Sequence, residues 1–174
     1  MNVENLRALQ EPLKAAYRQE PASAIVILRA NAVALDGVAC RLDTGRALVE
    51  AGLHPAAGGD GSQACSGDML LQALVACAGV TLSAVANSLG VRLRKAEVFA
   101  EGELDFRGTL AVARDAPVGF RALRLRFAID TEADQSTLAK IVELTERYCV
   151  VLRTLQASPP IAVTYNRTED SLTS

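Results

Sequence analysis

The chain has 174 residues, of which 18 are basic and 20 acidic, with a formal net charge of −2, and half of its residues are hydrophobic. This length fits one domain with one core, and the balanced charge, with no run of five like charges, argues against a nucleic-acid or membrane-surface binder. No secretory signal begins the sequence, so we expect a protein of the reducing cytoplasm. There the four cysteines, Cys40, Cys65, Cys77 and Cys149, should be free thiols at rest.

Residues 1–20 are predicted to form an amphipathic helix that docks on the rest of the chain. Leu6, Leu9, Leu13 and Tyr17 make a narrow apolar stripe at helical spacing on an otherwise polar segment. We therefore expect a helical extension at 1–20, a single domain at 21–166 and a disordered polar tail at 167–174.

Strands and a long loop are expected next. Residues 24–34 and 38–42 are rich in valine, isoleucine and alanine and are joined by Asp36-Gly37, a hairpin signal. Residues 46–50 could add a third strand. Residues 53–66 contain several glycines and are predicted to form a loop. This loop is not expected to bind phosphate, because it lacks the lysine of a phosphate-binding loop.

A long apolar helix is predicted from Gly67 or Asp68 to Leu89. Ser66 or Asp68 should cap its start and Gly90 should end it. Because few of its positions are polar, we expect this helix to be buried all round. Residues 69–86 approach the ~18 apolar residues of a membrane span, but their small and polar members favour a helix packed inside protein, and no membrane domain is expected.

The second half of the chain alternates between patterns typical of strands and of a helix. Residues 98–106 and 123–129 alternate apolar with charged side chains, as half-exposed antiparallel strands do. Residues 138–152 follow helical spacing and place Cys149 on the buried face of that helix. A final short strand is expected at 161–165, and the whole pattern indicates the α+β class.

Cys77 and Cys149 lie on two apolar helical segments 149 − 77 = 72 positions apart, so they are no local CxxC motif and any chemistry between them must be assembled by the fold. Only a thiolate attacks peroxides or disulfides, and an apolar helix raises the pKa of a thiol unless a positive group is near. We expect a guanidinium held by Asp68 to supply this charge. The candidates on the amino-terminal strands are Arg29, Arg41 and Arg46.

Structural roles compete with these chemical ones. A free cysteine is usually a small buried hydrophobe, which is the reading we favour for Cys40 and Cys65, although Cys65 is also a rival resolving thiol for Cys77. Metal binding is not expected, because one histidine, His54, and scattered cysteines lack the paired spacings of zinc sites. A hydrolytic triad is not expected either, since no G-x-S-x-G elbow is present.

Residues 58–155 resemble the OsmC/Ohr family of thiol-dependent peroxidases. The resemblance is carried by Gly58-Gly59-Asp60, by the run from Asp68-Met-Leu-Leu to Ala76-Cys77, and by Arg147-Tyr148-Cys149 followed by apolar residues. It implies an α+β fold in which antiparallel sheets of two intertwined subunits wrap two central helices, with active sites at the dimer interface. Two positions depart from the family pattern: Gly67 replaces a glutamate, leaving Asp68 as the acid, and Val150 replaces a proline.

The resemblance also implies a function. Cys77 would attack an organic hydroperoxide and Cys149 would resolve the product as a disulfide, which an external dithiol reduces, with no metal or organic cofactor. The alternative is an OsmC-like protein that senses redox state or binds a small ligand without turnover. A third reading is a structural protein with inert cysteines.

Overall fold

The computed structural model describes residues 19, 31–34, 39–43, 48–110 and 114–165, and the side chains from 50 onward within them. The expected amino-terminal helix, the Asp36-Gly37 turn, Arg29, Arg46 and the tail lie outside the described residues. Four strands form one sheet in the order β1-β2-β3-β4. Their bounds are β1 Asn31–Ala34, β2 Ala39–Asp43, β3 Leu48–Gly52 and β4 Ala64–Cys65.

The sheet confirms the three strands predicted in this part of the chain. β2 pairs antiparallel with both β1 and β3, whereas β4 pairs parallel with β3. The predicted loop at 53–66 is more structured than expected, because a 3-10 turn at Pro55–Ala57 and β4 lie within it. β4 leads directly into the long helix.

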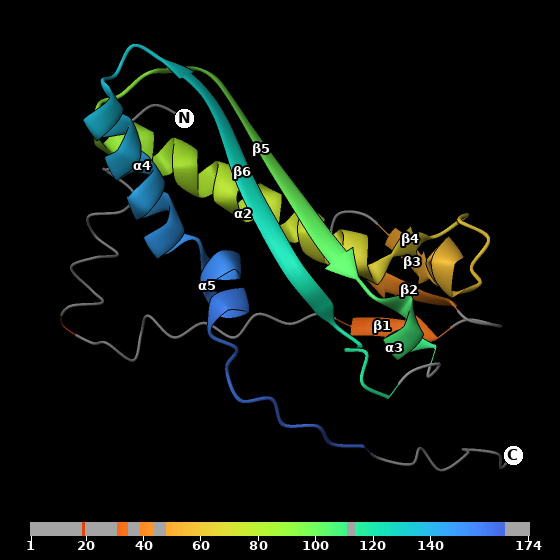
Figure 1. Ribbon diagram of the computed structural model, residues 1–174. Helices are drawn as coiled ribbons and strands as arrows, with labels where there is room; N and C mark the ends of the chain where they lie inside the picture. The colour runs from red at the N-terminus through yellow and green to blue at the C-terminus, as the bar shows by residue number, and fades with distance from the viewer. Residues whose placement is uncertain (1–18, 20–30, 35–38, 44–47, 111–113, 166–174) are drawn as a thin grey trace, which may run out of the picture.

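The long helix α2, Ser66–Ser88, runs from β4 to the end of the described domain opposite the four-stranded sheet (Figure 1). Gly90 follows with a φ of 70°, in the left-handed conformation that ends helices, as predicted. The predicted cap was wrong: the N-cap residue is Cys65, which makes no side-chain capping bond. The length and apolar composition of α2 would suit a membrane span, but five of its residues are buried in the core, in keeping with a core helix.

The helix α2 is buried on one side only, so the expectation of burial all round was wrong for a single chain. Leu74, Ala78, Leu82, Val85 and Ala86 face the core. On the other side, apolar positions are exposed: Leu70, Ala73, Ala76 and Val80, the last with 72% of its surface accessible. We call these four residues the exposed α2 face.

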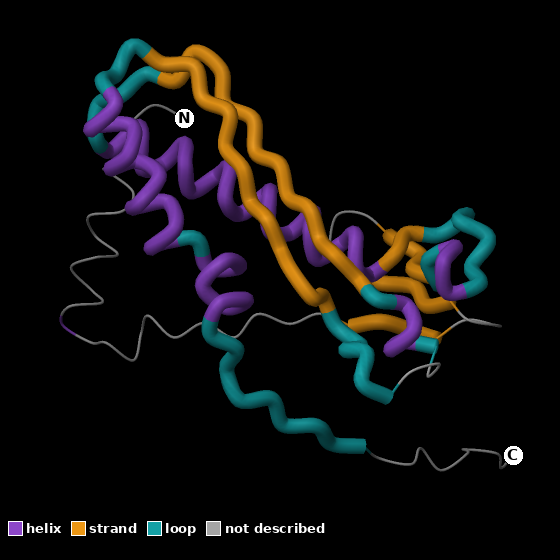
Figure 2. The backbone as a smooth tube through the Cα atoms, in the orientation of Figure 1, coloured by secondary structure: helices purple, strands orange, loops and turns teal. Residues whose placement is uncertain are grey.

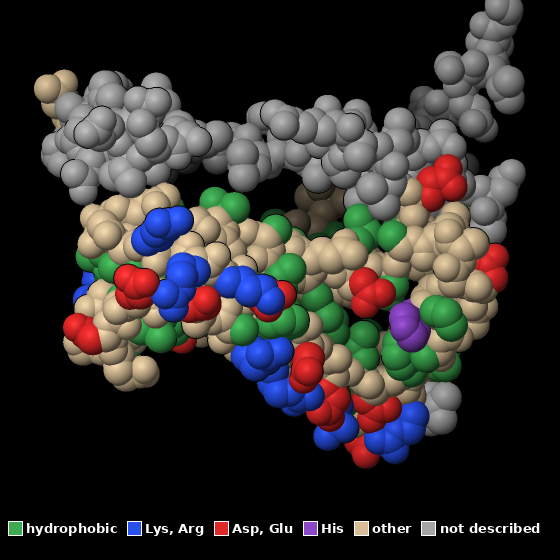
Figure 3. All heavy atoms as spheres, turned by 90° about the horizontal axis from the view of Figure 1, so that it is seen from above, with side chains coloured by type: hydrophobic (Ala, Val, Ile, Leu, Met, Phe, Trp, Pro, Cys, Tyr) green, Lys and Arg blue, Asp and Glu red, His purple; other side chains and the backbone are tan. Residues whose placement is uncertain are grey.

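A long antiparallel hairpin covers the buried side of α2 (Figure 2). It consists of β5, Leu93–Leu104, and β6, Phe120–Thr131, which confirms the two predicted half-exposed strands. Ion pairs such as Arg124–Glu101 and Arg121–Glu103 cross between the strands, and charged side chains gather on this part of the surface (Figure 3). Phe106, predicted as the end of the strand, begins the short helix α3, Phe106–Thr109.

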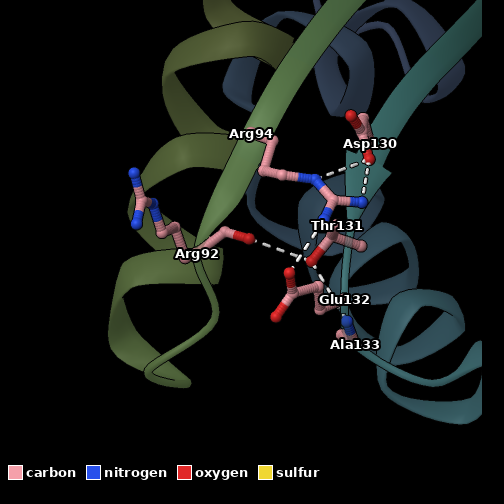
Figure 4. A network of polar contacts seen from close by, with 6 residues as sticks. All are labelled: Arg92, Arg94, Asp130, Thr131, Glu132 and Ala133. Atoms are coloured by element: carbon pink, nitrogen blue, oxygen red, sulfur yellow. Dashed lines mark hydrogen bonds and ion pairs between the residues drawn. The ribbon is translucent and has the colours of Figure 1, made fainter.

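A polar network fixes the passage from β6 into the next helix (Figure 4). The Arg94 guanidinium on β5 pairs with Asp130 and Glu132. The Thr131 hydroxyl donates to the Arg92 carbonyl at 2.9 Å and accepts from the Ala133 amide at 3.2 Å. Asp134 then caps helix α4, Gln135–Tyr148, by accepting from the Thr137 amide at 2.7 Å.

The predicted helix over 138–152 is divided in two. α4 ends at Tyr148, and α5, Val150–Gln156, follows after the single residue Cys149. Both helices pack on α2. The strand predicted at 161–165 is wrong for the single chain, because those residues are exposed and have no strand partner among the described residues.

The core where α2 and α4 meet should control stability. Leu82 has only 1% of its surface accessible and packs with Val85, Ala86 and Ile141. We expect Leu82→Ala to lower the free energy of unfolding by about 2–5 kcal/mol, because it leaves a cavity. The control Leu110→Ala, at a side chain 51% accessible, should change it by less than about 1 kcal/mol. Equal losses in urea titrations of the two variants would contradict this placement of the core.

Candidate functional site

The Cys77 thiol lies near the middle of α2, at the border between the buried side and the exposed α2 face. It is half-buried. Helical periodicity dictates this place, because Ala78 and Leu74 on one side are buried while Ala76 and Val80 on the other are exposed. A thiol at such a border is held by the core and stays accessible from outside.

The Cys149 thiol lies at the break between α4 and α5. Cys149 has an extended backbone, with φ −71° and ψ 106°, and is at once the C-cap of α4 and the N-cap of α5. Its residue surface is 0% accessible. The burial predicted for Cys149 from helical spacing is therefore confirmed, although the helix does not continue through it.

The fold brings these two thiols together. Burial opposes ionisation of Cys77, but several donors outweigh it and lower the pKa of this thiol. The donors are the backbone amide of Val151, the Cys149 thiol and the backbone amide of Val150, followed by the Thr81 hydroxyl. Since the Thr81 hydroxyl also donates to the Cys77 carbonyl at 2.8 Å, it has one proton for two acceptors and contributes least.

The pKa of the Cys149 thiol moves in the opposite direction. Burial raises it, and the neighbouring Cys77 sulfur raises it further by hydrogen bonding and by charge repulsion. Within the pair, Cys77 is therefore the thiol that ionises first and Cys149 the one that keeps its proton. Of the two thiols, the accessible one with the lowered pKa is therefore the better nucleophile.

The positive end that favours the Cys77 thiolate is the amino terminus of α5. The first amides of a helix have no partner within it and carry partial positive charge. The sequence instead predicted a guanidinium in this role. Of its candidates, Arg29 and Arg46 lie outside the described residues, and of Arg41 the structure describes only the backbone.

A signal for this arrangement was present in the sequence. Val150 stands where the resemblance places proline, and a valine has the backbone N–H that proline lacks. The departure from the pattern thus adds a donor toward Cys77. What the sequence did not reveal is the break at Cys149, which points this donor back toward α2.

Asp68, expected to support the site, is not beside Cys77 in the same chain. Nine residues of helix separate them, or about 13 Å along the axis. Cys65, the rival resolving thiol, is twelve residues away, or about 18 Å. Asp68 and Cys65 instead line a separate cavity of about 340 Å³ together with His54.

His54 closes one side of that cavity. Its ring stacks on Phe106 with the centroids 5.1 Å apart, and Nδ1 accepts from the Ala56 amide at 3.0 Å. Among the described residues, no group of three or more His, Cys, Asp or Glu side chains could hold a metal ion.

The contribution of the Val150 amide can be tested by pH titration of Cys77. Alkylation by iodoacetamide should have its midpoint below the ~8.5 of a free cysteine. Val150→Pro removes one donor and should raise this midpoint, and the extended backbone of Cys149 accepts a following proline. Val150→Ala keeps the amide and should leave the midpoint unchanged. If Val150→Pro folds and titrates like the wild type, the amide is not a donor to the sulfur.

A comparison with protein families identifies the family of this chain. Residues 59–164 match the model of the family described as OsmC-like protein. No match was found among curated protein sequences.

Several solved structures share the fold. An OsmC-like protein from Mycoplasma pneumoniae is 16% identical, with a TM-score of 0.64, over 76% of this chain and 89% of that one. The organic hydroperoxide resistance protein OsmC of Legionella pneumophila is also 16% identical, with a TM-score of 0.60, over 76% and 93%. OhrB of Bacillus subtilis, an organic hydroperoxide resistance protein, is 15% identical, with a TM-score of 0.53, over 76% and 94%.

Proposed function

Because the chain belongs to the OsmC-like protein family, we propose that it is a thiol-dependent peroxidase that reduces organic hydroperoxides. The observation that carries the proposal is the contact between Cys77 and Cys149, in which the first thiol has a lowered pKa and the second a raised one. The likeness to proteins named for organic hydroperoxide resistance supports the substrate class. The exposed apolar side chains near the thiols, Val80 and Tyr148, suit a substrate with an apolar body.

The proposed reaction has three steps. The Cys77 thiolate attacks the terminal oxygen of the hydroperoxide, the O–O bond breaks, and the alkoxide leaves as an alcohol after taking up a proton. The resulting Cys77 sulfenic acid condenses with the Cys149 thiol, which releases water and forms a disulfide. An external dithiol then reduces this disulfide, is itself oxidised, and returns both thiols.

The burial of Cys149 supports the order of these steps. A thiol with no accessible surface is protected from peroxide in solution, whereas the half-buried Cys77 is reachable. Because Cys149 already lies beside Cys77, the sulfenic acid meets its partner without a large rearrangement. Free thiols in this arrangement suit a reducing compartment, and we infer the cytoplasm.

Single substitutions of the two cysteines test the proposal. Cys77→Ser should abolish turnover of cumene hydroperoxide in the presence of a dithiol, because the nucleophile is lost. Cys149→Ser should still consume about one equivalent and retain a Cys77 sulfenic acid, detectable by intact mass and a dimedone adduct. Cys65→Ser is the matched control and should retain turnover.

The number of hydroperoxide equivalents consumed per subunit distinguishes an enzyme from a redox-sensing or ligand-binding protein. An enzyme consumes many equivalents of hydroperoxide per subunit while dithiol lasts. A sensor or binding protein stops at one disulfide, and that result with the wild type would replace the enzymatic function by redox sensing.

We also propose that the protein is a homodimer in which the exposed α2 face of each subunit is covered by the other. A soluble chain rarely leaves a run of apolar helix positions exposed without a partner. The carboxyl-terminal segment adds to this unpaired apolar surface, since Ile161, Val163 and Tyr165 are 82%, 88% and 95% accessible. A second copy offers both surfaces a partner and could bring Asp68 of one subunit toward the thiols of the other.

Light scattering tests the dimer. Wild-type protein at micromolar concentration should have twice the subunit mass of 18.4 kDa. Val80→Glu places a charge on the exposed α2 face and should shift the mass toward the monomer. Asn87→Glu adds the same charge at an exposed polar position of the same helix and should leave the dimer intact. A wild-type monomer would contradict the proposal.

A further inference from the structure

A groove of about 570 Å³ lies between β6 and α4, and neither Cys77 nor Cys149 lines it. Its apolar lining comes from both elements, with Phe127 and Ile129 on the strand and Leu138 and Val142 on the helix. All four side chains are only partly buried. The described chain therefore leaves an apolar surface open between two of its regular elements.

The edge of the groove is acidic. Glu143 and Glu146 line it and are exposed. Lys140 pairs with Glu143 at 2.9 Å, and no described residue forms an ion pair with Glu146. An occupant of this groove should thus combine an apolar stripe with positive charge beside it.

Residues 1–18 have these two properties in their sequence. Leu6, Leu9, Leu13 and Tyr17 form the apolar stripe. The basic residues of the segment, Arg7, Lys14 and Arg18, recur at intervals of seven and four, with Glu11 among them. On a helix these four residues would share one side next to the stripe, with a net positive charge. Apolar residues with a basic flank complement an apolar groove with an acidic edge.

We propose that residues 1–18 bind in the groove between β6 and α4 of the same chain, with the stripe on Phe127, Ile129, Leu138 and Val142 and the basic flank beside Glu143 and Glu146. The proposal does not depend on the peroxidase function.

The intervening chain is long enough for this placement. β1 begins at Asn31, near the amino-terminal end of α2, whereas α4 begins near the other end (Figure 1). The helix α2 has 23 residues and is about 35 Å long. The thirteen steps from residue 18 to Asn31 can span about 45 Å, so residues 1–18 can reach the groove of their own chain.

Hydrogen exchange of the full chain tests the proposal, with two double variants matched in charge. Leu9→Glu with Leu13→Glu places two carboxylates on the stripe. Ala8→Glu with Ala15→Glu places two on the opposite side of the same predicted helix. We expect the first variant to speed amide exchange in peptides covering the carboxyl half of β6 and α4 by about tenfold or more, since burial of two leucines is lost. The second variant should leave this exchange unchanged.

Three results would overturn the proposal. The first is equal exchange in wild type and in the Leu9/Leu13 variant. The second is faster exchange of equal size in both variants, which would indicate a charge effect without a docked stripe. The third is wild-type protection of the groove that falls on dilution, which would assign the groove to a second copy of the chain.

Discussion

The burial of the Cys149 thiol against Cys77 is the contact on which the rest of the described structure depends. It requires α4 to pack on α2 as far as Thr145, whose hydroxyl is satisfied within its own helix by donating to the Ile141 carbonyl at 2.7 Å. It also requires the chain to leave the helical conformation for one residue, so that α5 starts with its amides directed at the sulfur of Cys77. A continuous helix through Cys149 would bury the same thiol but leave no free amides there.

The β5–β6 hairpin helps to fix the position of Cys149 relative to Cys77. Individually, its exposed ion pairs contribute little to stability, but together with the Arg94 and Thr131 contacts they define where the chain turns from β6 into α4. Because α4 is held at this end and packs on α2 along its length, the position of Cys149 follows from two independent anchors. The thiol pair thus sits on rigid elements rather than on loops.

The sequence predicted the elements whose side chains alternate or repeat over many residues. α2, β5 and β6 were found because their apolar periodicity is long, and Gly90 marked the end of α2 because only a left-handed residue suits that place. The interruption of the helix at Cys149 was not predicted, because the apolar residues have the same helical spacing before and after it. The segment 161–165 alternates like a strand, but a strand needs a partner, and the described residues of one chain offer none. Those residues likewise leave one face of α2 uncovered.

The amino terminus of α5 has a consequence for oxidised protein. Its Val150 and Val151 amides lower the pKa of the Cys77 thiol by favouring the thiolate, and a sulfur in a disulfide would carry no such charge. In a Cys77–Cys149 disulfide the two amides would lose this charged acceptor, while the new covalent bond would itself join the start of α5 to α2. By linkage, the more these amides stabilise the Cys77 thiolate, the more they would favour the free thiols over the disulfide. A short helix would thereby influence the reduction potential of two sulfurs that lie outside it.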